Sequence, residues 1–131
     1  MCGRNDKLRI ELQKRNACHA VGFTDEMFYY MQLADFFVGK PGPGSISEAL
    51  QSGLPVIVER NKRTLPQERY NTRWVEKREV GIVIKSFKRV ARAVQVLLKD
   101  DALEQFQKNA RSLQNQAVFQ IPEIFDQIME R

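Results

Sequence analysis

A glycine-rich turn between two apolar segments holds the residues whose types and spacing could bind an anion. Phe36–Gly39 is a short apolar run typical of a buried strand, and Gly42 and Gly44 would allow backbone conformations that a side chain forbids. Ser45 is a good helix N-cap, and its spacing from Glu48 fits a capping box. The free N–H groups and dipole of a helix beginning here favour an anion, most often a phosphate. The alternative is a well-capped strand–helix–strand unit and nothing more, because a glycine turn alone is a weak signal.

A second group of polar side chains falls on one face of a helix predicted from Pro66 to about Arg78. Gln67 and Asn71 are four residues apart, and Glu68 and Asn71 are three apart, so all can share that face. Amide and carboxylate groups suit the hydroxyl groups of a sugar. We expect this face to look into the same cleft as the glycine turn; the alternative is an ordinary polar helix face.

Residue types that commonly act in catalysis or metal binding are scarce. His19 is the only histidine, and no Asp or Glu partner is evident nearby, so we expect a structural or surface role. Cys2 and Cys18 form neither a disulfide framework nor a metal-ligand pattern, and we interpret both as free thiols in a reducing compartment. We therefore predict no metal site and no cofactor, and we identify no catalytic residue.

The elements that must position these residues follow from apolar periodicity. Strands are predicted at Ala17–Gly22, Phe36–Gly39, Val56–Val58 and Val80–Ile84, and helices at Lys7–Arg15, Asp25–Gln32, Ser45–Ser52 (closed by Gly53), Pro66–Arg78, Phe87–Leu98, Asp101–Gln116 and from Pro122 onward. This alternation predicts an α/β fold, a Rossmann-like parallel sheet with helices on both faces. Ligands of such folds bind outside the carboxyl ends of the strands, where the candidate residues are expected.

Composition predicts one soluble globular domain. The 131 residues are 43% hydrophobic and 28% charged, with no apolar run long enough to cross a membrane and no signal peptide pattern. The net charge of +5 suits an anionic partner, namely a nucleotide phosphate, an anionic bilayer surface or nucleic acid. Any single basic cluster can equally be a solvated surface. We expect a cytoplasmic protein that can lie peripherally at a membrane.

A series of short motifs is spread over nearly the whole chain. The motifs are Cys2-Gly3-Arg4-Asn5, Gly22-Phe23-Thr24-Asp25-x-Met27, Ala34-Asp35, Gly42-Pro43-Gly44-Ser45-x-x-Glu48-Ala49-Leu50, Gly53-Leu54-Pro55 and Gln67-Glu68-x-x-Asn71. Their order resembles the C-terminal donor-binding domain of family 28 glycosyltransferases, which have the GT-B fold. This family includes plant monogalactosyldiacylglycerol synthases and the UDP-N-acetylglucosamine transferase of peptidoglycan synthesis.

The resemblance implies a role for each part of a UDP-sugar donor. It places the diphosphate on the turn Gly42-Pro43-Gly44-Ser45, at its backbone N–H groups (proline has none) and at the Ser45 hydroxyl. It places the ribose hydroxyls on Glu48, although the same carboxylate could cap Ser45 instead. The backbone at Phe23–Thr24 would cover the uracil, and the polar face of the helix that begins at Pro66 would orient the transferred sugar through Gln67, Glu68 and Asn71. Lys40 or Arg63 would add positive charge near the phosphates.

The resemblance also implies what residues 1–131 lack. The family's donor domain opens with a strand that precedes the Cys2 position, and its acceptor-binding N-terminal domain supplies the general base. We therefore expect a fragment, a truncated product or one half of a two-chain enzyme, inactive alone, that needs a partner domain or self-associates. The predicted function is the donor-binding part of an inverting glycosyltransferase that moves a hexose from a UDP-sugar to a lipid such as diacylglycerol. A silent nucleotide- or protein-binding fragment is the alternative, and a nucleic-acid-binding module ranks last because no such signature is present.

Overall fold

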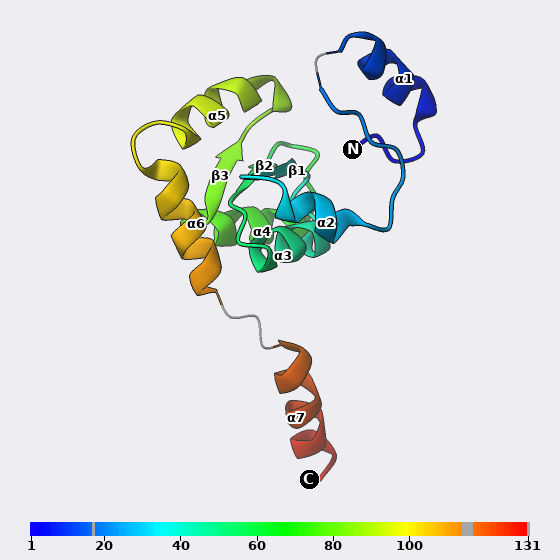
Figure 1. Cartoon of the computed structure of the whole chain (residues 1–131). Coiled ribbons are helices and arrows are strands. Elements are labelled where there is room, and N and C mark those ends of the chain that lie inside the picture. The colour runs from blue at the N-terminus through cyan, green and yellow to red at the C-terminus, as the bar shows by residue number, and fades with distance from the viewer. Residues whose placement is uncertain (17, 114–116, 131) are drawn as a thin grey trace. The chain divides into compact units, whose positions relative to one another are not determined.

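A computed structural model describes residues 1–16, 18–113 and 117–130 (Figure 1). It divides into two compact units, an N-terminal unit (Met1–Gln32) and a C-terminal unit (Leu33–Arg131). All three strands described belong to the C-terminal unit.

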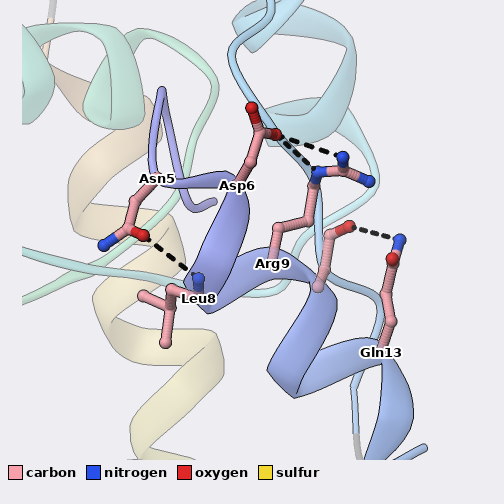
Figure 2. Close-up of polar contacts among 6 residues, drawn as sticks. Asn5, Asp6, Leu8, Arg9 and Gln13 are labelled. Atoms are coloured by element: carbon pink, nitrogen blue, oxygen red, sulfur yellow. Dashed lines mark hydrogen bonds and ion pairs between the residues drawn. The ribbon is translucent and has the colours of Figure 1, made fainter.

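The N-terminal unit contains helices α1 (Asp6–Lys14) and α2 (Met27–Gln32). Figure 2 shows how local polar contacts fix α1: the Asn5 side chain caps it by accepting from the Leu8 N–H (3.1 Å), and the Asp6 carboxylate pairs with Arg9. Gly3 adopts a φ of +55°, which turns the chain into this cap. The motif at residues 2–5 therefore has a structural explanation as a turn followed by a helix cap.

The strand predicted at Ala17–Gly22 does not form in its described part, residues 18–22. Within the described residues, the Cys2 N–H donates to the Val21 carbonyl (2.7 Å), an isolated contact and not a ladder. An apolar pattern alone cannot supply the partner strand that a ladder needs. The following helix begins at Met27, later than expected, while the Thr24 hydroxyl accepts from the Glu26 N–H (3.0 Å).

The C-terminal unit is built on a parallel sheet of strands β1 (Phe37–Gly39), β2 (Val56–Glu59) and β3 (Gly81–Ile84), in the order β1-β2-β3. In the register, Val38 lies opposite Ile57, and Ile57 opposite Ile82. The predicted α/β fold with a Rossmann-like parallel sheet flanked by helices is thus confirmed.

Two helices connect the strands and the remaining ones follow β3. They are α3 (Pro43–Gln51), α4 (Pro66–Lys77), the 3-10 turn η1 (Phe87–Arg89), α5 (Val90–Leu97), α6 (Ala102–Ser112) and α7 (Ala117–Met129). The expected extension of α6 to Gln116 falls on residues 114–116, which lie outside the described residues. The expectation that Pro122 starts the last helix is wrong, since Pro122 lies inside α7. Proline there removes the bond to the carbonyl of Val118 and its ring crowds that carbonyl, which weakens the helix at this turn.

The helices cover both faces of the sheet. Both crossovers, through α3 and then α4, step along the sheet in one direction, so right-handed connections place both helices on one face (Figure 1). The opposite face is covered by α5 and α6, where Ile57 and Ile84 join Ala93 and Leu97 in a buried core cluster. Val56 and Val58, which alternate with Ile57, point to the α3 and α4 side and are fully buried. This two-sided core holds the starts of α3 and α4 at the carboxyl ends of the strands.

Candidate functional site

The glycine turn leads directly into α3, but the helix begins earlier than its sequence suggested. Gly42 is the N-cap, with φ −66° and ψ 138°, and its carbonyl accepts the first helical bond from the Ile46 N–H (3.1 Å). Pro43 occupies the first helical position, where its missing N–H costs nothing and its fixed φ suits the helix. Ser45 is therefore inside the first turn, and the predicted capping box between Ser45 and Glu48 is wrong.

Gly42 and Gly44 do not need to be glycine for conformational reasons. Neither has a positive φ, and a Cβ built on either would meet no atom within 4 Å. The expectation that they adopt conformations forbidden to other residues is thus wrong, because the turn uses ordinary backbone angles. Because neither residue has a side chain, the space in front of the first backbone N–H groups of α3 is open. These N–H groups have no acceptor within the helix. Such a site admits an anion to close contact with the backbone.

A hydrogen bond joins the turn to α4. The Asn71 side-chain amide donates to the Pro41 carbonyl (2.9 Å), across 30 positions of sequence. Asn71 is half-buried, and its side-chain carbonyl oxygen takes no part in this bond. The expected meeting of the α4 polar face with the glycine turn therefore occurs at Asn71.

The other predicted polar side chains, those of Glu68, Gln67 and Glu48, differ in exposure and in the contacts they make. Glu68 is half-buried and reaches back to the Leu65 N–H (3.3 Å), so it caps α4. Gln67 lies exposed on the first turn of α4. Glu48 follows Gly44 by four residues on the exposed face of α3, and its carboxylate makes no hydrogen bond or ion pair within the described residues. Glu48 is consequently available to accept from hydroxyl groups of a ligand.

A groove of about 430 Å³ runs between α3 and α4. Among the predicted site residues, Pro43 and Asn71 line it, while Gly44, Ser45, Glu48, Gln67 and Glu68 do not. Tyr70, Trp74 and Arg78 also line it. Their spacing of four residues along α4 is the signal that could have grouped them.

Phe23 and Thr24 belong to the N-terminal unit. The Phe23 ring is largely exposed and lies under the Arg4 guanidinium, at 5.3 Å from the ring centroid. The Thr24 hydroxyl is engaged with the start of α2. The neighbouring turn is thus held by side-chain contacts that leave the Phe23 ring edge open to solvent.

Comparison with protein families identifies the family of this chain. Residues 1–128 match the model of the glycosyltransferase family 28 C-terminal domain. The chain belongs to this family. The glycine turn, the start of α3 and Asn71 of α4 therefore lie within a family 28 domain.

Named relatives of this family 28 chain include lipid glycosyltransferases. Monogalactosyldiacylglycerol synthase 2 of Arabidopsis thaliana is 36% identical over the whole chain, which covers 29% of that protein. The processive diacylglycerol beta-glucosyltransferase of Bacillus licheniformis is 30% identical over 86% of the chain, covering 30% of that protein. The spinach (Spinacia oleracea) monogalactosyldiacylglycerol synthase is 31% identical over the whole chain, covering 26% of that protein. The chain therefore spans less than a third of the length of these curated relatives.

Side chains that commonly bind metal ions do not gather in the described part of this family 28 chain. It contains no group of three or more His, Cys, Asp or Glu residues that could hold a metal ion. Cys2 and Cys18 are free thiols, as expected. None of its described helices has the length and apolar character needed to cross a membrane.

Proposed function

We propose that this chain is the donor-binding part of an inverting glycosyltransferase that moves a hexose from a UDP-sugar to diacylglycerol. The start of α3 is the observation that carries this proposal. Gly42 and Gly44 leave open space before backbone N–H groups, and nothing in the fold itself requires either glycine. A diphosphate is the part of a nucleotide sugar that such a helix terminus suits. The family and the names of the lipid glycosyltransferase relatives support the reaction class.

Each part of the donor has a proposed set of residues. The diphosphate lies on the backbone of Gly42–Ser45 with the Ser45 hydroxyl, and the ribose hydroxyls donate to Glu48. The transferred hexose lies against Gln67, Glu68 and Asn71 of α4. Asn71 then has two tasks, because its amide holds Pro41 while its carbonyl oxygen accepts from a sugar hydroxyl.

In the proposed reaction, the chain binds the leaving group, UDP. The acceptor hydroxyl attacks the anomeric carbon, the bond from that carbon to the diphosphate oxygen breaks, and the acceptor proton goes to a base. The positive end of α3 stabilises the charge that develops on the departing UDP. We assign the base and the diacylglycerol to an acceptor-binding domain or partner chain, and we expect the assembly to act peripherally at a membrane facing the cytoplasm.

Binding of UDP to the purified chain tests the nucleotide assignment. Isothermal titration calorimetry should give saturable binding, and Glu48→Ala should weaken it about tenfold or more, because a charge-assisted pair of hydrogen bonds is lost. Glu104→Ala is the matched control, since it removes an exposed glutamate from helix α6, outside the residues assigned to the donor. The variant should bind like the native chain.

Two results would contradict the proposal. One is a folded chain, shown by circular dichroism, that does not bind UDP at concentrations well above those of cellular nucleotides. The other is equal loss of binding in both variants, which would remove Glu48 from the site. A chain that binds UDP but transfers no hexose to diacylglycerol by itself is the expected behaviour of the donor part alone.

A further inference from the structure

A second cavity, of about 740 Å³, lies on the far side of α4 from the groove. It is formed by the loop after β2, the outer face of α4 and the carboxyl end of β3. Its lining residues are Arg60, Asn61, Lys62, Arg69, Arg73, Glu76, Val83, Ile84 and Lys85.

The charges that line this basic pocket are unbalanced. Five of its side chains are cationic and one is anionic, and the anionic one, Glu76, is already paired with Arg60 (3.1 Å). Lys62, Arg73 and Lys85 form no ion pair within the described part of the chain. Arg69 donates to backbone carbonyls, so four of the five lining cations lack a carboxylate partner within the described residues. A concave surface of this kind concentrates positive potential and attracts a multiply charged anion.

The loops that carry these cations are held by a network of hydrogen bonds. The Arg69 guanidinium donates to the carbonyls of Thr64 (3.0 Å) and Lys62 (3.1 Å), which fixes the loop after β2 against α4. Glu59 accepts from both the Asn61 side chain (2.9 Å) and the Phe87 N–H (2.8 Å). Glu59 thereby ties the loop after β2 to the loop after β3. Lys62 and Lys85 consequently project from loops whose backbones are fixed, which lowers the entropic cost of binding a shared anion.

The basic pocket contains none of the residues assigned to the donor, and it is also distinct from the groove. Tyr70, Asn71 and Trp74 of α4 line the groove, whereas Arg69, Arg73 and Glu76 line the basic pocket. The two cavities share no lining residue, and α4 stands between them. A ligand of the basic pocket therefore needs no contact with the glycine turn.

We propose that the basic pocket binds a phosphate group through Lys62, Arg73 and Lys85, in addition to and independently of the donor nucleotide. Phosphate matches the chemistry because it offers several oxygens and more than one negative charge to converging cations. The lining contains no aromatic side chain, whereas single-stranded nucleic acids are usually held by aromatic stacking. The phosphate belongs either to a small soluble molecule or to the headgroup of an anionic phospholipid, which share this chemistry.

Two probes distinguish the sources. Inorganic phosphate is titrated into the isotope-labelled full chain, and saturable shifts of the amides at residues 60–64 and 85 indicate a soluble ligand. Phosphatidylcholine vesicles with and without phosphatidylserine are then tested by co-sedimentation. Binding that requires the anionic lipid, without a response to inorganic phosphate, indicates a lipid headgroup, and either result supports the phosphate site.

A matched pair of double variants localises the site. Lys62→Ala with Arg73→Ala should weaken binding of the responsive probe at least fivefold, which is about the effect of one cation near an anionic surface. An alanine at position 62 keeps the backbone carbonyl that accepts a hydrogen bond from Arg69. Arg92→Ala with Lys108→Ala removes the same charge from exposed positions on α5 and α6 and should leave binding nearly unchanged. Both double variants should bind UDP like the native chain, which keeps this test independent of the donor site.

Three outcomes overturn the proposal. The first is the absence of a saturable response to both probes by a folded chain. The second is equal weakening by the two double variants, which would mean a diffuse effect of net charge. The third is an RNA oligonucleotide that shifts the amides at residues 60–64 while phosphate and anionic vesicles leave them unchanged.

Discussion

Gly44, at the start of α3, is a residue whose effect on stability can be separated from its proposed effect on ligand binding. Gly44 lies within the helix, has no positive φ and faces open space. Glycine in a helix costs roughly 0.5–1 kcal/mol relative to alanine, so its presence here disfavours the fold slightly. Under the proposed function, the glycine lets the diphosphate approach the backbone closely.

Gly44→Ala should therefore keep or raise stability while it weakens UDP binding. We expect the free energy of unfolding to rise by up to about 1 kcal/mol, because alanine is the better helix former. Urea unfolding and UDP titration on the same preparation measure both effects. Unchanged UDP affinity would show that the nucleotide does not approach this backbone.

The residue types of the candidate site could be identified from sequence, but their constraints could not. Local spacing placed Gln67, Glu68 and Asn71 on one helix, and that prediction of a helix is confirmed. Local spacing could not show that the Asn71 amide donates to the Pro41 carbonyl, since this contact joins positions 30 apart. Sequence spacing also favoured Ser45 as the cap, whereas the preference of proline for the first helical position moved the start to Pro43.

At the scale of elements, the end of α3 is as well defined as its start. Gly53 adopts a φ of +74°, its N–H donates to Leu50 (2.9 Å) and the Leu54 N–H donates to Ala49 (2.9 Å). These two bonds form a Schellman motif, which satisfies the last carbonyls of the helix. The expectation that Gly53 closes the helix is confirmed.

Gly53→Ala should destabilise the chain, in contrast to Gly44→Ala. A side chain at positive φ costs about 1–2 kcal/mol, and the new Cβ would lie 3.0 Å from the Arg111 side chain, which must shift. Thermal unfolding of the two variants in parallel measures the difference. If the two alanine variants proved equally stable, the left-handed conformation at Gly53 would not be setting the helix end.

Elements differ in how well sequence predicts them because they depend on different ranges of contact. Strands β1 to β3 and helices α1 and α4 were predicted within about two residues, since apolar runs and periodic patterns are local. The strand expected at Ala17–Gly22 failed in its described part because a ladder requires a partner that local pattern does not specify.

At the scale of the whole molecule, α7 exposes an apolar face. Ile121, Ile124, Phe125 and Ile128 follow the helical period, and each side chain is between 53% and 64% exposed. A contiguous apolar stripe of this kind is typical of a contact surface. It agrees with the expectation that the chain associates with itself or with a partner domain.

We predict that the isolated chain self-associates through α7. Sedimentation velocity should show concentration-dependent association that Ile121→Glu with Ile128→Glu reduces, since each glutamate places a charge on the apolar face. Gln120→Glu with Gln127→Glu adds the same charge at the same spacing on the polar side of α7 and should have little effect. A native chain that stays monomeric at all concentrations tested would contradict this prediction.

Patterns within short windows are enough to predict the α/β class and the strands β1, β2 and β3, and they point to the turn before α3 as a candidate anion site. Which distant groups meet depends on the tertiary structure. It joined Asn71 to Pro41, and it gathered Lys62, Arg73 and Lys85 from three separate segments into one pocket. Such contacts depend on crossover direction and on packing against the sheet, which act over the whole chain and leave no local signature.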